Sequence, residues 1–108
     1  MNKTSMNRDS VAVVTGASQG IGRATAVRLA RDFSVVVLTA RKEDELKSTA
    51  AAVTEAGAEP LVCALDLREP QSAETLVRNT LERFGRIDAL LNIAGAVPQI
   101  DQIGRAHV

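Results

Sequence analysis

The sequence predicts an α/β protein in which a parallel β-sheet carries helices on both faces, a doubly wound arrangement. Four short apolar runs alternate with three segments of helical periodicity, and short connections join them, which is typical of successive β-α-β units. Aromatic residues are limited to Phe33 and Phe84, so the core must consist of Ala, Val, Leu and Ile, as suits buried parallel strands. A length of 108 residues allows one domain at most.

Each of the four apolar runs has the length and composition of a buried strand. The first is β-branched and ends in a glycine cluster, and the second is almost continuously apolar. We expect the four strands at Val11–Thr15, Val35–Thr39, Pro60–Leu65 and Ala89–Ile93.

Three helices are expected between these strands. Over about Ile21–Arg31, small apolar residues alternate with arginines, as in a helix with one solvated face. The second helix covers Glu43–Ala56, with Gly57 as its stop. Pro70 opens the third helix and Gly85 ends it. The apolar stripe of this third helix is expected to consist of Ala73, Leu76, Val77, Leu81 and Phe84.

Composition excludes several classes of function. The 13 basic and 13 acidic residues give no net charge, so nothing favours binding to nucleic acid or an anionic membrane. No apolar stretch approaches the roughly 20 residues of a membrane span, and the polar segment Met1–Ser10 is no signal peptide. The single cysteine, Cys63, lies in an apolar run, so we expect a buried, inert thiol in a cytoplasmic protein.

A glycine-rich loop, Thr15–Gly22, lies where the first strand meets the first helix. In a doubly wound sheet this helix directs its amino end into the ligand crevice, where free N–H groups and the helix dipole meet a pyrophosphate. Gly16 permits a tight turn, Gly20 lets the backbone approach the phosphates, and Gly22 lets helix and strand pack closely. The alternative to a nucleotide-binding loop is an ordinary strand-to-helix turn.

Three motifs in register resemble the short-chain dehydrogenase/reductase family. The loop reads Thr-Gly-x-x-x-Gly-Ile-Gly, like the cofactor motif of that family. The pair Asp66 and Leu67 ends the third strand, where the family contacts the adenine ring. The fourth strand ends in residues 92–95, Asn-Ile-Ala-Gly, similar to the family's Asn-Asn-Ala-Gly, with Ile93 in place of the second Asn. The resemblance implies the amino-terminal half of a Rossmann dinucleotide-binding domain over residues 11–96.

The resemblance assigns cofactor-binding roles residue by residue, and alternatives stay open for several of them. Ser18 and Gln19 are included by loop position, and a solvated-loop role fits them equally. Asp66 has an alternative role as a turn carboxylate, and Asn92 has one in tying neighbouring strands together. The full set of expected cofactor-binding residues is Gly16, Ser18, Gln19, Gly20, Ile21, Gly22, Arg41, Asp66, Leu67, Asn92, Ala94 and Gly95.

The end of the second strand predicts which nicotinamide cofactor is preferred. An acidic residue there would bind the ribose hydroxyls and repel a 2′-phosphate, but Ala40 occupies that position and Arg41 follows it. A guanidinium binds phosphate through two charge-assisted hydrogen bonds, so we expect Arg41 to favour NADP(H) over NAD(H). In the alternative interpretation, Arg41 is a solvated loop residue.

No catalytic residue can be assigned in this chain, and none is assigned to a metal. The resemblance implies a catalytic Ser after a fifth strand and a Tyr-x-x-x-Lys on the next helix, but the sequence has no tyrosine and its serines all precede the fourth strand. His107 has no carboxylate partner nearby in the sequence and is discounted. The helices that pair subunits in the family would lie beyond Val108, and we expect the parent protein to be a homo-oligomer.

The two ends of the chain are expected to lie outside the folded unit. We expect residues 1–10 to be a disordered lead-in and residues 97–108 an irregular tail. Residues 103–108 resemble the translation of one frame of a sequencing adapter, and our hypothesis is that they are non-native; the alternative is a true, unstructured C-terminus.

Three functions remain open from the sequence. The chain is a fragment of an oxidoreductase that transfers hydride between a nicotinamide cofactor and a carbonyl or alcohol substrate, or a short nucleotide-binding module without catalysis. The third, sugar-nucleotide epimerase or dehydratase chemistry, is disfavoured by the Gly-Ile-Gly ending of the loop.

Overall fold

The computed structural model describes residues 10–93. The expected lead-in, the site residues Ala94 and Gly95, and the tail at residues 97–108 with its segment 103–108 therefore lie outside the described residues, apart from Ser10. Among the described residues, no helix is long and apolar enough to cross a membrane.

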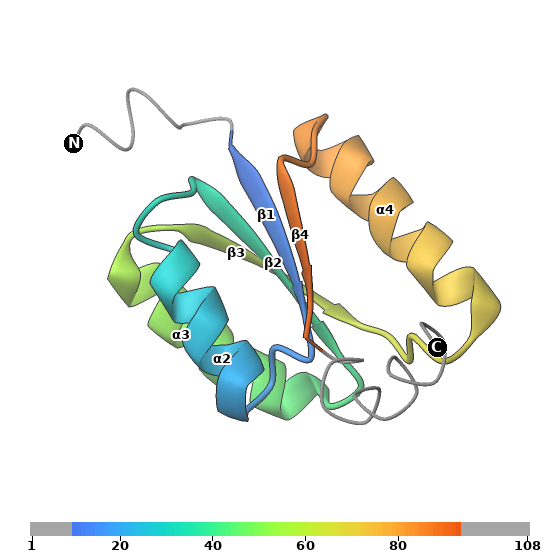
Figure 1. The fold of residues 1–108 in the computed structure, drawn as a ribbon, viewed down its shortest axis with the longest axis horizontal. Coiled ribbons are helices and arrows are strands. Elements are labelled where there is room, and N and C mark those ends of the chain that lie inside the picture. Colours follow the sequence, from blue (N-terminus) through green and yellow to red (C-terminus); the bar gives the residue numbers. More distant parts are fainter. Residues whose placement is uncertain (1–9, 94–108) are drawn as a thin grey trace, which may run out of the picture.

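Over residues 10–93, the predicted order of strands and helices is confirmed, with four parallel strands in the order β3-β2-β1-β4. Helices α2 and α3 lie on one side of this sheet and α4 on the other, so the partial doubly wound fold is also confirmed (Figure 1). The elements are β1 (Val11–Thr15), α2 (Gly20–Leu29), β2 (Val35–Ala40), α3 (Glu43–Ala56), β3 (Glu59–Ala64), α4 (Pro70–Phe84) and β4 (Ala89–Asn92).

Alternate residues of the central strands form two apolar cores, one on each face of the sheet. The core beneath α2 and α3 contains Val14, Val36 and Leu38 from the strands, together with Leu46 and Val53 from α3. The core beneath α4 is made of Val11, Val13, Val35, Val37, Cys63 and Leu76. Both faces of β1 and β2 are therefore covered, which explains why these strands lack polar alternation.

The predicted helix-ending residues are confirmed. Gly57 and Gly85 follow α3 and α4 with φ of 110° and 81°, in the left-handed region that favours glycine at a helix end. Pro70 is the first residue of α4, where its missing N–H costs no helical hydrogen bond.

Four predicted elements differ from the structure by one or two residues at their ends. Strand β2 ends at Ala40 rather than Thr39, and helix α2 begins at Gly20 rather than Ile21. Helix α2 ends at Leu29 rather than Arg31, because the amides of Asp32 and Phe33 both donate to the Leu29 carbonyl and close the helix there. Strand β3 covers Glu59–Ala64, one residue earlier than expected. Strand β4 ends at Asn92, one residue before its expected end.

The predicted apolar stripe of α4 is partly wrong. Ser72, Leu76 and Thr80 are the buried residues of this helix, four positions apart, whereas Val77 and Leu81 are 42% and 44% exposed. Ala73 is also exposed. The Thr80 hydroxyl donates to the Leu76 carbonyl at 2.8 Å, so this buried polar group is satisfied within the helix. Helix α4 thus contacts the sheet along a narrower line than its apolar residues suggest.

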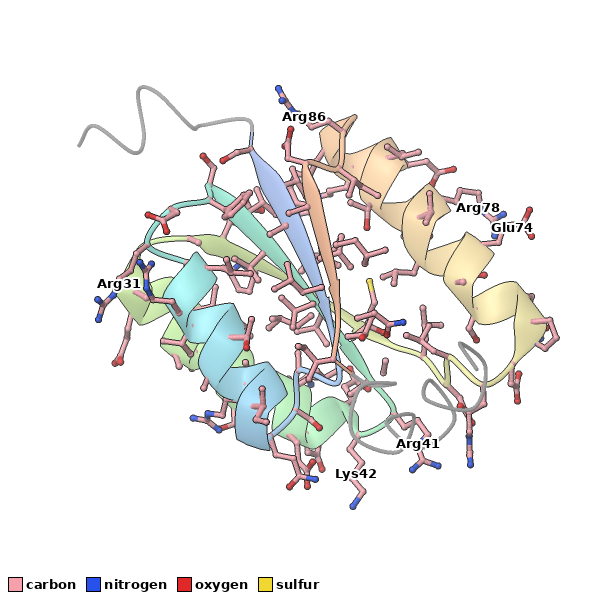
Figure 2. All side chains as sticks on the ribbon, in the orientation of Figure 1. Arg31, Arg41, Lys42, Glu74, Arg78 and Arg86 are labelled. Atoms are coloured by element: carbon pink, nitrogen blue, oxygen red, sulfur yellow. The ribbon has the colours of Figure 1, made fainter. Side chains whose placement is uncertain are left out.

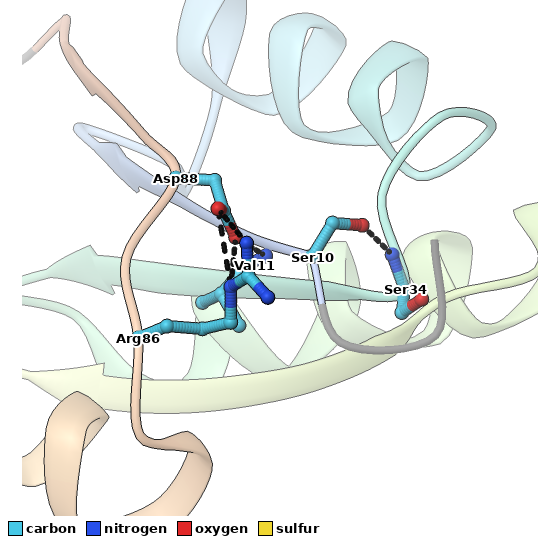
Figure 3. A network of polar contacts seen from close by, with 5 residues as sticks. All are labelled: Ser10, Val11, Ser34, Arg86 and Asp88. Atoms are coloured by element: carbon cyan, nitrogen blue, oxygen red, sulfur yellow. Dashed lines mark hydrogen bonds and ion pairs between the residues drawn. The ribbon is translucent and has the colours of Figure 1, made fainter. Parts of the chain in front are cut away.

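A polar network joins the strands at the edge of the sheet opposite the glycine loop (Figure 3). The Val11 amide donates to the Asp88 carboxylate at 2.8 Å, and Arg86 holds the same carboxylate through contacts of 2.6–3.1 Å. The Ser34 amide donates to the Ser10 hydroxyl oxygen at 3.1 Å. Asp88, the residue that precedes β4, therefore holds the start of β4 beside the start of β1.

Candidate dinucleotide-binding site

The carboxyl ends of the parallel strands bring most of the predicted site residues to one edge of the sheet. Thr15 pairs with Thr39 on one side and with Asn92 on the other, so β1, β2 and β4 end at the same level. The glycine loop follows β1 and Arg41 follows β2. Asp66 and Leu67 follow β3, which pairs with β2 up to Ala64. This edge is where doubly wound proteins bind their ligands.

The glycine loop has backbone geometry that requires glycine at three positions. Gly16 and Gly20 have φ of 66° and 61°, which other residues rarely adopt. A Cβ atom on Gly22 would overlap the Gly16 carbonyl oxygen, so this position has no room for a side chain. Gly16 thus has the conformation of a tight turn and Gly22 packs closely against the loop backbone, while their contact with a cofactor stays a prediction.

The amino end of α2 is open to a ligand. Its N-cap residue, Gln19, forms no side-chain cap, and the first turn contains no acidic side chain. Gln19, Gly20 and Ile21 are exposed, and Ser18 is half-buried. By contrast, α3 places Glu43, the first of three consecutive acidic residues, in its first turn. Unsatisfied N–H groups without a neighbouring carboxylate can bind an anion by donating hydrogen bonds to it.

Three hydrogen bonds hold the glycine loop against neighbouring elements, the longest of them from the Thr49 hydroxyl to the Ser18 carbonyl at 3.5 Å. The Ala17 amide donates to the Thr39 carbonyl at 3.2 Å. The hydroxyl of Thr49, a fully buried residue of α3, donates to the Ala17 carbonyl at 2.9 Å. No sequence motif identifies Thr49 as a site residue, although its spacing from Leu46 and Val53 places it on the buried face of α3.

Asn92 joins β4 to β1. Its side-chain oxygen accepts a 2.8 Å hydrogen bond from the Thr15 hydroxyl. This contact is the strand-tying role that the sequence left as an alternative. The Asn92 side chain is also exposed at the carboxyl edge, so the amide nitrogen can still donate to a ligand.

Arg41 is exposed and extends away from the loop that follows β2, next to Lys42 (Figure 2). Two of the nearby carboxylates belong to other pairs. Glu45 lies 4.0 Å from the Lys42 ammonium, and Glu43 lies 3.8 Å from that of Lys47. The Arg41 guanidinium thus lies at the carboxyl edge of the sheet and forms no ion pair with a residue of the described range 10–93.

Asp66 is held by Arg68, two residues further along the chain. The Arg68 amide and Nε donate to Asp66 Oδ1 at 3.0 and 3.1 Å, and Nη2 donates to Oδ2 at 3.0 Å. These hydrogen bonds, with smaller effects of the Arg68 and Arg41 charges, lower the pKa of Asp66 to about 2. Asp66 is therefore ionised at neutral pH, where it can only accept hydrogen bonds, and its turn contact with the Arg68 amide is the alternative role given in the sequence analysis.

Other candidate sites contribute little. A groove of about 380 Å³ between β3 and α4, lined by Cys63 and Arg83 among others, contains none of the predicted cofactor-binding residues. Burial raises the pKa of the Cys63 thiol, which agrees with the expected inert cysteine. Within residues 10–93, no group of three His, Cys, Asp or Glu side chains is placed to hold a metal ion.

The chain belongs to the short chain dehydrogenase family, whose family model matches residues 10–106. It is 40% identical over 93 residues to the short-chain reductase protein NovJ of Streptomyces niveus, covering 86% of this chain and 36% of that protein. It is 42% identical over 89 residues to levodione reductase of Leifsonia aquatica, covering 81% and 33%. The chain thus spans about a third of the length of these relatives.

Solved structures agree with this assignment. A metagenomic short-chain oxidoreductase in complex with NADP superimposes with a TM-score of 0.72 and 39% identity, over 76% of this chain and 37% of that one. NAD⁺-bound xylitol dehydrogenase gives a TM-score of 0.72 and 33% identity, over 76% and 32%. Both nicotinamide cofactors occur among these similar structures.

Proposed function

We propose that the chain is the cofactor-binding part of an oxidoreductase that uses NADP(H), and that it has no catalytic activity alone. The main support for this proposal is the glycine loop, in which Gly22 leaves no room for a side chain and the amino end of α2 has no side-chain cap. When bound there, the cofactor would supply the hydride, and this chain would hold its adenosine and pyrophosphate. The cofactor-binding residues proposed are the twelve named from the sequence.

The preference for NADP(H) rests on Arg41. No acidic residue follows β2 until Glu43, and that carboxylate lies beside Lys47. An exposed guanidinium at the carboxyl edge is suited to a 2′-phosphate, which it can bind through two parallel hydrogen bonds. The similar metagenomic oxidoreductase was solved in complex with NADP, which supports the proposal. The similar xylitol dehydrogenase was solved with NAD⁺, so the fold alone does not determine the cofactor preference.

Calorimetric titration of the chain with NADP⁺ and NAD⁺ tests this preference. We expect tighter binding of NADP⁺, and a loss of about tenfold in Arg41→Ala, the effect of one or two charged hydrogen bonds, with NAD⁺ binding nearly unchanged. Lys42→Ala removes a neighbouring charge and serves as the matched control. Equal affinity for both cofactors in the unmodified chain would contradict the preference.

For the parent protein, the proposed reaction is hydride transfer between the cofactor and a carbonyl or alcohol substrate. The reductases among the relatives support this reaction class, and we propose a cytoplasmic homo-oligomer by analogy with the family. Sequencing the source locus downstream of the Gln102 codon tests it. A frame that continues into a Ser followed by Tyr-x-x-x-Lys supports the oxidoreductase, whereas a genomic stop after Val108 favours the short nucleotide-binding module.

A further inference from the structure

Arg68 leaves the Asp66 carboxylate with one unused acceptor position. A carboxylate has about four lone-pair positions, two on each oxygen. The Arg68 amide and Nε use both positions on Oδ1, and Nη2 uses one on Oδ2. The remaining position is on Oδ2, and the Asp66 side chain is 28% exposed, so a ligand can reach it.

The loop that carries this pair is tied to its surroundings by the backbone. The Leu65 amide donates to the Ala40 carbonyl at 3.0 Å, which fixes the loop beside the end of β2. The Glu69 amide donates to the Asp66 carbonyl at 3.0 Å. Two side-chain contacts and one backbone contact from a single residue then fix the rotation of the carboxylate. This geometry is more specific than that of a common surface ion pair.

We propose that Arg68 is a positioning residue that aims Asp66 Oδ2 at the exocyclic amino group of the cofactor's adenine and so selects adenine over bases with a carbonyl at that position. The inference rests on the proposed binding of NADP(H) at this edge. An amino group donates to the free position on Oδ2, whereas a carbonyl oxygen there meets a carboxylate that cannot donate. Without the Arg68 side chain, only the backbone amide of residue 68 still holds the carboxylate, so its orientation loosens and the discrimination weakens.

The test compares NADP⁺ with its hypoxanthine counterpart, in which an oxygen replaces the 6-amino group. Calorimetric titration of the full 108-residue chain gives the adenine preference as a ratio of dissociation constants. We expect this ratio to fall about tenfold in Arg68→Ala, the worth of one oriented hydrogen bond to a charged group. Arg68→Lys should lower it as well, because an ammonium keeps the charge but cannot form the fork.

Arg78→Ala, at an exposed position of α4, is the matched control and should leave the ratio unchanged (Figure 2). A ratio that is unchanged or larger in Arg68→Ala would overturn the inference, since Arg68 would then be neutral or would itself contact the base. Full retention of the ratio in Arg68→Lys would also overturn it, because charge alone would suffice.

Two outcomes separate this inference from the proposed function. An unmodified chain that binds neither NADP⁺ nor NAD⁺, although circular dichroism shows it folded, contradicts the proposed function. A chain that binds NADP⁺ with the same ratio in Arg68→Ala contradicts only the inference. If the chain does not fold alone, the same variants are measured in a chimera in which residues 11–93 replace the matching segment of the Streptomyces niveus reductase. The same two outcomes apply to the chimera.

Discussion

At the scale of single residues, Thr49 shows how a helix far along the chain supports the glycine loop. Its buried hydroxyl donates to the Ala17 carbonyl across 32 positions of sequence. Helical periodicity places Thr49 on the buried face of α3, but it does not reveal which carbonyl the hydroxyl meets. Such long-range partners depend on the assembled fold, so Thr49 and Asp88 could not be assigned from sequence motifs.

Replacing Thr49 with Val keeps the shape of the side chain and removes its hydrogen-bond donor. We expect Thr49→Val to lower the free energy of unfolding by about 1–3 kcal/mol, because the Ala17 carbonyl loses a buried partner. Thr54→Val, at an exposed position of the same helix, should change it by less than about 0.5 kcal/mol. Urea unfolding of both variants measures the difference, and equal effects would contradict the role assigned to Thr49.

Asp66 predicts a specific pH dependence. Its pKa of about 2 in the folded chain is below the value of about 3.9 for an unfolded chain. The contribution of Asp66 to stability is therefore complete above about pH 4 and is lost as the pH falls towards 2. Urea unfolding of the unmodified chain and Asp66→Asn should differ most near pH 5 and converge near pH 2. A difference that does not change with pH would contradict this assignment.

At the scale of elements, local sequence patterns predicted which helices form and where they end, but not which face of each helix is buried. Apolar periodicity and the residues Gly57, Pro70 and Gly85 predicted the existence and the ends of α3 and α4, because those signals act within a few residues. The prediction of the buried face of α4 was partly wrong, because burial depends on the line along which the helix contacts the sheet. Polar Ser72 and Thr80 are buried there, and apolar Val77 and Leu81 are exposed.

Two leucines on α4 provide a matched test of that correction. Leu76 is 4% exposed and packs in the core beneath the helix, whereas Leu81 is 44% exposed. We expect Leu76→Ala to cost about 2–5 kcal/mol of stability and Leu81→Ala less than about 0.5 kcal/mol. Urea unfolding distinguishes them. A larger cost for Leu81→Ala would restore the face expected from the sequence.

At the scale of the whole molecule, the sheet has an apolar edge. Within residues 10–93, strand β4 is the last strand on its side, and Leu90 on it is 61% exposed. Leu90 pairs with Val13, so it lies on the same face of the sheet as the core beneath α4. An apolar edge strand of this kind promotes association between chains.

We expect the 108-residue chain to be marginally stable, with a free energy of unfolding below about 5 kcal/mol. Urea unfolding monitored by circular dichroism measures it. Leu90→Lys should reduce association in analytical ultracentrifugation, because a charge on an edge strand opposes pairing. A sharp, cooperative transition of more than 5 kcal/mol for a monomeric chain would contradict this expectation.

The central claim is that the carboxyl edge of the sheet binds a nicotinamide dinucleotide. The most direct test is nuclear magnetic resonance of the ¹⁵N-labelled chain titrated with NADP⁺. We expect shifts concentrated at the amides of Gly16–Gly22, Arg41 and Asp66–Arg68, with none near Ser34 and Arg86 at the opposite edge. Saturating shifts at the opposite edge, or no shifts in a folded chain, would contradict it.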